Sequence, residues 1–262
     1  MSSMALLSFP LDQIILFLFI LVRVSAILFV VPFFSSRNMP MLLKVSLAVA
    51  VAWLLLPQLD ITPPDPFKSP AGLVLGVVSE IAIGLIIGII VQLMFAGIQL
   101  AGQMAGFQMG FAIANVVDPA SSLQIPLLSQ FLNVFALLIF LSLNIHYYFI
   151  KALVDSFELI PMWGAHFEEN LFHLIVQIVS GAFVIAVKVG APVMVALLLT
   201  SVALGLIART VPQMQIFIVA MPLKILLGLL FLGFSLPFCA DFLKTAFASM
   251  GNTILGLIRI LS

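Results

Sequence analysis

Six long hydrophobic stretches dominate this sequence and restrict the folds that the chain can adopt. The stretches are residues 10–31, 42–56, 72–100, 127–149, 171–207 and 213–242. A helix that crosses a membrane needs about 20 mostly apolar residues. The chain is 64% hydrophobic and 8% charged, whereas a soluble domain has about 25% charged residues. The sequence therefore predicts an all-α integral membrane protein with about six long hydrophobic helical regions.

Three prolines lie inside the last two hydrophobic regions. Pro192, Pro222 and Pro237 each remove a helix hydrogen bond and clash with the preceding turn. The third and fifth regions also exceed one bilayer thickness, so we expect them to tilt, project beyond the membrane or break. We therefore expect kinked or broken helices, and we expect the last region to be two segments that meet near Met221 and Pro222.

The few charges in the connections predict an orientation in the membrane. Arg37 and Arg209 lie in short connections, whereas the connections at 59–70 and 151–170 carry most of the acidic residues. Basic loops tend to stay in the cytoplasm. The pattern predicts that Arg37 and Arg209 face the cytoplasm, and that the acidic loops and both termini face the opposite side.

Glycines recur at every fourth position around one carboxylate. The row consists of Gly72, Gly76, Glu80, Gly84 and Gly88, and Gly102 begins a second row with the same spacing. Residues four apart lie on one face of a helix, and small residues at this spacing let two helices approach closely. The row therefore predicts a surface for helix packing.

Charged residues lie in or beside the hydrophobic stretches, among them Arg23, Glu80, Lys188, Lys224 and Arg209. Within a membrane such groups must pair, extend toward water or face a polar interior. Glu80 and Asp118 are the candidate partners of the buried cations. For Glu80 we favour a buried ion pair or a hydrogen bond across an interface, and a proton relay or ion path is the alternative.

Residues 102–126 lie between apolar stretches but are not built like a membrane span. Glycine recurs at positions 102, 106 and 110, and prolines stand at 119 and 126. Irregular polar backbone at membrane depth survives only against protein or beside a water-filled path. Two interpretations stay open, a close-packed helix crossing or a flexible constriction sealed by methionine and phenylalanine. Asp118 before Pro119 is typical of a helix cap, and ion coordination is the minority interpretation.

Several function classes receive no support from the sequence. The net charge is zero, so no basic surface predicts nucleic-acid binding. The single cysteine, Cys239, excludes an internal disulfide and a thiolate metal cluster. No metalloprotease, phosphate-loop or dinucleotide motif is present. We therefore expect a protein that is not an enzyme and that carries no metal or cofactor.

Four stretches together resemble the FliR-like proteins of the type III secretion export-gate family. They are RVSAILFVVPFFSSRNMP, GFQMGFAIANVVDPASSLQIP, FLSLNIHYYFIKALVDSFELIP and ALGLIARTVPQMQIFIVAMPLKI, in this order. The resemblance covers nearly the whole chain, and the second and fourth stretches are specific in combination. It favours the flagellar export system and implies a multi-pass protein of the bacterial inner membrane within the flagellar basal body.

The resemblance also implies an architecture and a set of partners. One FliR-like chain joins several copies of FliP and of FliQ in an assembly around the path for unfolded export substrates. This assembly sits high relative to the membrane, which implies that hydrophobic helices form re-entrant hairpins against partners. FlhB, FlhA and proximal rod proteins are further expected partners. The chain is expected to be one unit, 1–262, with a FliP-like part at 1–170 and a FliQ-like helical hairpin at 171–262.

By the same resemblance, the central loop at 106–122 helps to plug the closed channel. The plug residues that match the family pattern are Gly106, Phe107, Gln108, Met109, Gly110, Phe111, Ala112, Ile113, Ala114, Asn115, Val116, Val117, Asp118 and Pro119. This implies a structural and gating subunit of a protein-export channel. The alternatives are an ion-coupled small-solute secondary transporter, which broken helices and the charges Glu80 and Lys188 would suit, and a passive membrane scaffold.

Overall fold

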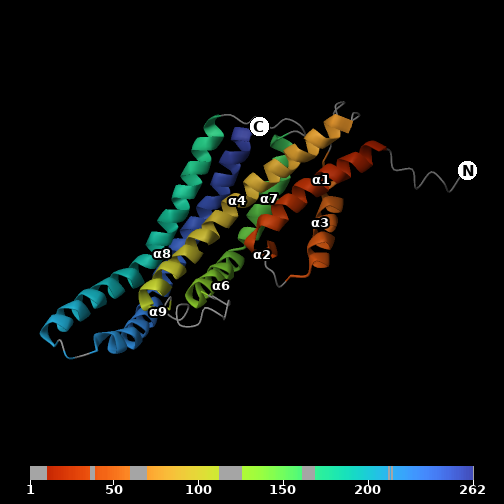
Figure 1. Cartoon of the computed structure of the whole chain (residues 1–262). Helices are drawn as coiled ribbons and strands as arrows, with labels where there is room; N and C mark the ends of the chain where they lie inside the picture. The colour runs from red at the N-terminus through yellow and green to blue at the C-terminus, as the bar shows by residue number, and fades with distance from the viewer. Residues whose placement is uncertain are drawn as a thin grey trace, which may run out of the picture. The chain divides into compact units, whose positions relative to one another are not determined.

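The computed structural model describes residues 11–35, 39–59, 70–111, 126–160, 169–211, 213 and 215–261, which form helices and turns without a strand (Figure 1). The helices are α1 (Leu11–Val30), α2 (Pro32–Ser35), α3 (Met41–Leu55), α4 (Pro70–Met109), α6 (Leu127–Ser142), α7 (Ile145–Leu159), α8 (Glu169–Thr210) and α9 (Ile216–Leu261). Four of these helices are long and apolar enough to cross a membrane, or five if α6 and α7 form one bent span. The all-α membrane class is confirmed, with fewer candidate spans in the described chain than the six hydrophobic regions.

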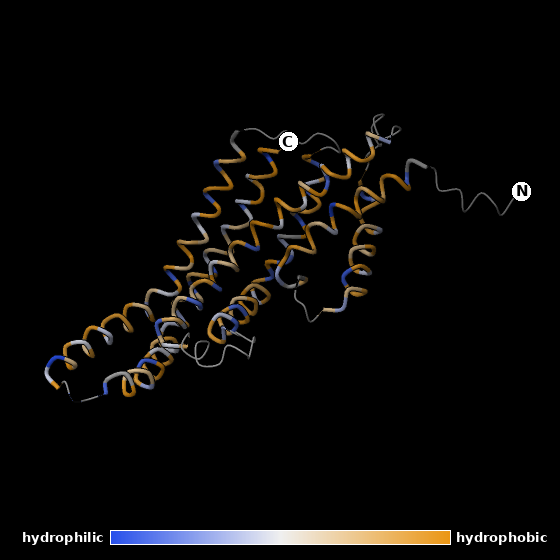
Figure 2. Tube along the Cα trace, in the orientation of Figure 1, coloured by the Kyte–Doolittle hydropathy of each residue, from blue (hydrophilic) through white to orange (hydrophobic). Residues whose placement is uncertain are grey.

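Proline marks where several of these helices begin. Pro32 and Pro70 are the first residues of α2 and α4, and Pro40 and Pro126 directly precede α3 and α6. Proline suits these places because the first turn of a helix has no internal partner for its N–H groups. Apolar residues then run along most of each long helix (Figure 2).

Helices α4, α8 and α9 are far longer than a bilayer requires. They contain 40, 42 and 46 residues, which corresponds to about 60–70 Å each at 1.5 Å per residue. Helix α4 continues to Met109, so the first part of segment 102–126 is regular helix, which agrees with the interpretation of a close-packed helix crossing. A helix satisfies its own backbone groups, so this part needs no water-filled path.

The prolines inside the long helices do not divide them. Pro192 lies within α8, and Pro222 and Pro237 lie within α9. The prediction of two segments that meet near Met221 and Pro222 is therefore wrong. Each proline removes one N–H donor, but the hydrogen bonds of the neighbouring turns keep the helix continuous, and both helices curve along their length (Figure 1).

The predicted region 127–149 is two helices rather than one. Helix α6 ends at Ser142 and α7 begins at Ile145, with their axes turned by 71°. Asn144 between them has a φ of 53°, a left-handed conformation that asparagine tolerates better than most residues. Helix α7 also includes the first half of the predicted acidic loop 151–170, so that half is helical.

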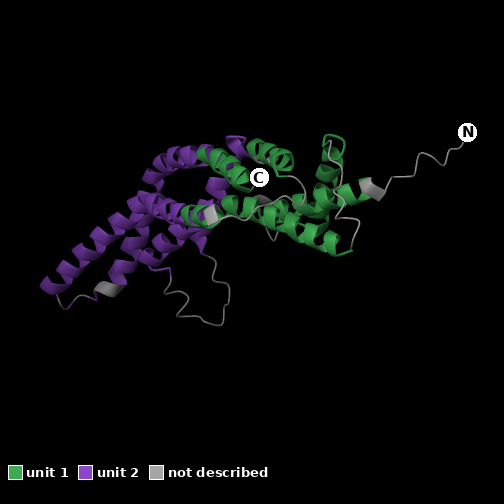
Figure 3. Cartoon of the chain, turned by 90° about the horizontal axis from the view of Figure 1, so that it is seen from above, with its two compact units in different colours: residues 1–92, 146–177, 249–262 green, residues 93–145, 178–248 purple. Residues whose placement is uncertain are grey.

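The chain forms two compact units, neither of which is continuous in sequence (Figure 3). Unit 1 contains residues 1–92, 146–177 and 249–262, and unit 2 contains 93–145 and 178–248. Because each unit draws residues from both parts, the division into 1–170 and 171–262 stays a prediction.

Each unit has its own aromatic contacts. In unit 1, the rings of Phe17 on α1 and Trp53 on α3 lie 6.0 Å apart. In unit 2, Phe95, Phe140 and Phe247 bring α4, α6 and α9 together, with ring centroids 5.6–5.9 Å apart. These apolar clusters fix the helices that carry the candidate site.

Candidate functional site

Two glycines of α4 let α1 approach its backbone closely in unit 1. A Cβ atom on Gly84 would lie 2.6 Å from the Cβ of Ala26 and 2.9 Å from the carbonyl oxygen of Arg23. A Cβ on Gly88 would lie 2.7 Å from the Cβ of Val30. Contacts this short exclude any larger residue without a shift. The order of the contacts shows that α1 and α4 run in the same direction.

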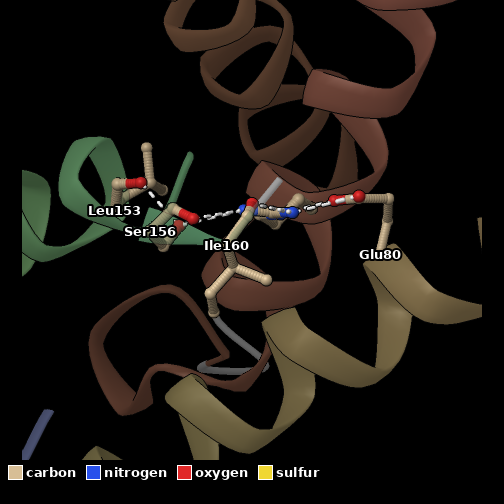
Figure 4. Close-up of polar contacts among 5 residues, drawn as sticks. Glu80, Leu153, Ser156 and Ile160 are labelled. Atoms are coloured by element: carbon tan, nitrogen blue, oxygen red, sulfur yellow. Dashed lines mark hydrogen bonds and ion pairs between the residues drawn. The ribbon is translucent and has the colours of Figure 1, made fainter. Parts of the chain in front are cut away.

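This close approach places a buried arginine against a buried glutamate one turn before Gly84. Arg23 on α1 and Glu80 on α4 are both fully buried. The Arg23 Nε donates to Glu80 Oε2, and Arg23 Nη2 donates to Glu80 Oε1 at 3.0 Å (Figure 4). The pairing is bidentate, which is the strongest geometry for this pair of residues.

Helix α7 supplies the remaining acceptors for the guanidinium of Arg23. Arg23 Nη1 donates to the carbonyl oxygen of Ser156 at 2.8 Å and to its hydroxyl at 3.4 Å, and Nη2 donates to the carbonyl oxygen of Ile160 at 3.4 Å. The Phe157 ring lies 4.2 Å from the Arg23 Cζ. All five N–H donors of the guanidinium thus have an acceptor. A fully paired, fully bonded arrangement is the condition under which a buried charge is tolerated.

Of the two carboxylates that the sequence offered to the buried cations, the structure gives Glu80 to Arg23. Both oxygens of Glu80 accept from Arg23, so Glu80 links α4 to α1, and Arg23 connects both helices to the end of α7. Lys188 on α8 is exposed, with its Nζ 5.2 Å from the centroid of the Phe242 ring, and Lys224 on α9 is half-buried. Asp118 lies outside the described residues, together with the rest of residues 112–119 of the predicted plug.

We predict that Glu80→Gln destabilises the protein by about 3–5 kcal/mol, because it leaves a buried guanidinium without a counter-charge. The double variant Arg23→Leu with Glu80→Leu should recover much of this loss, since neither charge then stays buried. Thermal unfolding of detergent-extracted protein, followed by size-exclusion fluorescence, measures both. A double variant as unstable as Glu80→Gln would contradict the paired arrangement.

In unit 2, the second half of α4 uses glycine against two further helices. A Cβ on Gly97 would clash with the carbonyl oxygen of Ala182 on α8, and a Cβ on Gly102 would lie 2.7 Å from the backbone nitrogen of Ser129 on α6. The Ser129 hydroxyl donates to the carbonyl oxygen of Gln99 at 2.9 Å, and Gln99 Nε2 donates to Asn133 Oδ1 at 3.0 Å. Polar bonds thus lie where the α4 and α6 backbones come closest.

Helix α4 ends at a glycine in a left-handed conformation. Gly110 has a φ of 95°. Its N–H donates to the carbonyl oxygen of Phe107 at 3.1 Å, and the N–H of Phe111 donates to that of Gly106 at 3.1 Å. This pair of bonds is the Schellman motif, which satisfies the last carbonyl groups of a helix. Gly110, which the sequence placed in a flexible plug, therefore terminates α4 at a defined point.

A methionine at the end of α4 fits against a glycine of α9. Met109 is fully buried, and a Cβ on Gly228 would lie 2.8 Å from the Met109 Cγ and 3.0 Å from its sulfur. The Met221 methyl group lies 3.6 Å from a Cβ built on Gly110. Methionine packs well into irregular gaps of this kind. The last residues of α4 are therefore held by α9.

Sequence reasoning missed Gly97, Ser129, Ser156 and Gly228. A signal for Gly97 was present, because Ala-Gly pairs recur at 96–97, 101–102 and 105–106. Nothing in the sequence singled out Ser156, which contributes mainly a backbone carbonyl.

Gly72 and Gly76 of the predicted packing row are buried. Among the described residues, no group of three or more His, Cys, Asp or Glu could hold a metal ion.

Comparison with known proteins decides the family. The model of a family described as bacterial export proteins, family 1, matches residues 14–250. The chain belongs to this family. It is 34% identical over 222 residues to the flagellar biosynthetic protein FliR of Bacillus subtilis (strain 168), with 82% of this chain and 84% of the relative covered.

Two further relatives have the same description. FliR of Escherichia coli (strain K12) is 32% identical over 238 residues, covering 91% of this chain and 90% of the relative. FliR of Buchnera aphidicola subsp. Acyrthosiphon pisum (strain APS) is 33% identical over 224 residues, covering 86% of each chain. The resemblance to FliR-like export proteins is confirmed along most of the chain, including α4 and the helices packed on it.

We predict that Gly228→Ala lowers the thermal stability, because the new methyl group displaces the buried Met109 side chain at a cost of about 1–3 kcal/mol. Gly233→Ala on the same helix is the matched control, since open space surrounds Gly233. The cost of Gly228→Ala should nearly vanish in a Met109→Ala background, measured by thermal unfolding. An equal cost in both backgrounds would show that the two residues do not contact each other.

Proposed function

We propose that this bacterial export protein is the structural and gating subunit of the flagellar type III protein export gate, in the bacterial inner membrane. Its membership of the export family and its similarity to flagellar biosynthetic proteins over most of their length support this proposal. Helices long and apolar enough to cross a membrane support the location.

The observation that carries the gating role is the way α4 ends. Met109 is anchored against Gly228, Gly110 turns the chain out of the helix, and Phe107 is exposed at the last turn. Phe107, Met109 and Gly110 lie in the first part of the predicted plug, residues 106–119, and the chain continues into its second part, residues 112–119, which lies outside the described residues. A gate needs a fixed frame and a segment that can change course, and a glycine cap beside an anchored methionine supplies both.

The predicted plug is suited chemically to a seal against ions. Its residues are mostly apolar, and hydrophobic constrictions block ions by excluding water. While Met109 stays packed against Gly228, the bulky phenylalanines of the predicted plug can fill a narrow passage. We infer that these side chains close the channel at rest and move aside when an unfolded flagellar protein passes.

The proposed seal predicts different effects for two variants. Deletion of 112–119 should let ions leak across the membrane while export continues, and Gly110→Val should reduce export because a β-branched residue is strained at a φ of 95°. Ion flux into energised membrane vesicles, secreted flagellar proteins and swarming report these effects. Gly181→Val is the control, since open space surrounds Gly181. Full export by Gly110→Val and tight vesicles for the deletion would favour a passive scaffold.

We propose that the chain acts in a hetero-oligomer, as one copy with several copies each of FliP and FliQ, and that FlhB, FlhA and proximal rod proteins contact this assembly. Many large apolar side chains are exposed on the single chain, for example Leu42, Phe172 and Phe238. Exposed apolar surface of this extent marks contact with lipid or protein partners.

Native mass spectrometry of the tagged chain, gently extracted from its own cells, tests this assembly. We expect one large complex that holds a single copy of this chain and multiple copies of two smaller membrane proteins. A lone chain or a homodimer would contradict the proposed assembly and revive the ion-coupled transporter. That alternative relied on an available Glu80, and Arg23 occupies both of its carboxylate oxygens.

A further inference from the structure

One part of unit 2 exposes apolar side chains on both of its helices. This distal section consists of residues 189–208 of α8 and 216–240 of α9, which are joined by the short connection between the two helices. Its exposed large side chains include Leu199, Phe234 and Phe238, the last two at 70% and 77% exposure. Exposure on the outer faces of both helices leaves a large surface without a cover in the single chain.

The uncharged length of the distal section matches the hydrocarbon core of a bilayer. The Cys239 sulfhydryl lies 3.7 Å from the carbonyl oxygen of Val189, so these residues are level in the antiparallel pair. Between Lys188 and Arg209, α8 has no charge over about 30 Å at 1.5 Å per residue. Between Lys224 and Asp241, α9 has none over about 24 Å. A typical hydrocarbon core is about 30 Å thick.

The polar side chains of the uncharged section need no water. Thr200 and Ser201 donate to the carbonyl oxygens of Ala196 and Leu197 at 2.8 Å, and Ser235 donates to that of Leu232 at 2.9 Å. Thr200, Ser201 and Ser235 are the serine and threonine residues of 189–208 and 225–240, and the hydroxyl of each donates to a carbonyl group of its own helix. Hydrocarbon demands such internal satisfaction. The N-terminal part of α8 differs, because it exposes His173 and Gln177.

Charged groups mark both ends of the section. At the end away from the turn, the exposed Asp241 and Lys244 form an ion pair of 3.0 Å at 78% and 53% exposure, which would be costly in hydrocarbon. At the other end, the register places Lys224 about five residues, or roughly 7.5 Å, inside the level of Arg209. Hydrophilic residues also gather around the turn between α8 and α9 (Figure 2).

The direction of the two lysine side chains agrees with these ends. Side chains on a helix point toward its N-terminus. For Lys188 on α8 that direction leads away from the uncharged section, and for Lys224 on α9 it leads toward the turn. Both ammonium groups can therefore reach the interfaces while their carbon stems stay beside apolar residues.

We propose that the lipid bilayer surrounds the distal section. One boundary of the hydrocarbon core lies at the level of Lys188 and Asp241, and the other lies near Lys224 and Arg209. Helices α8 and α9 would then be in lipid over only about half of their length. The occupant is lipid rather than a protein partner because the uncharged length and the charged ends match a hydrocarbon core, with which the internally bonded hydroxyls are compatible. The proposal does not depend on the gating role.

Spin labels on single cysteines in the full-length chain, within its extracted assembly in lipid nanodiscs, test this placement. In a Cys239→Ala background, Leu199→Cys and Phe234→Cys lie inside the distal section, and Phe183→Cys, at a position 59% exposed on α8 before Lys188, is the matched control. Oxygen, which concentrates in lipid, should relax the labels at 199 and 234 several-fold more than a water-soluble nickel chelate does. At 183 the order should reverse.

Two outcomes would overturn the placement. Equal oxygen preference at 183 and 199 would put the bilayer elsewhere on α8. Immobile labels at 199 and 234, shielded from both relaxing agents, would mean that a protein partner covers the section. Val202→Cys replaces Leu199→Cys if that variant fails to accumulate, because Val202 is also exposed on α8.

Discussion

The ion pair between Arg23 and Glu80 sets the condition that the rest of unit 1 must meet. Both groups are fully buried, so their charges are tolerable only when every donor and acceptor is engaged. The bidentate geometry needs α1 and α4 at very short separation, which Gly84 allows. The remaining donors need the carbonyl groups at the C-terminal end of α7. One pair of charges therefore fixes three helices that are far apart in the sequence.

Unit 2 relies on the same close approach, and none of its described residues is a buried charge. Gly97 admits the backbone of α8, Gly102 admits that of α6, and Gly228 admits the side chain of Met109. Dispersion between closely packed atoms and a few polar bonds replace the ion pair there. Because α4 carries most of these contacts, its last turn is held firmly up to the glycine cap. The predicted plug therefore begins from a fixed point.

The distal section and the end of α4 show how one apolar chain serves different surroundings. In the distal section, the hydroxyl groups bond to their own helix and apolar side chains face outward. At the end of α4, buried small residues and methionine face other helices of the chain. The surroundings that suit a helix segment depend on which of its faces carries small residues, which carries bulky residues, and where the charged residues lie along it.

The sequence by itself determined the helical membrane class and the export family, because long uncharged apolar runs and an ordered set of motifs are local properties of the chain. It also indicated that Gly84, Gly88 and Gly102 pack helices. It did not determine that Arg23 pairs with Glu80, that Met109 lies on Gly228 or that α9 passes unbroken through Pro222. Those features depend on contacts between residues distant in the sequence and on the neighbouring turns, so only the tertiary structure decided them.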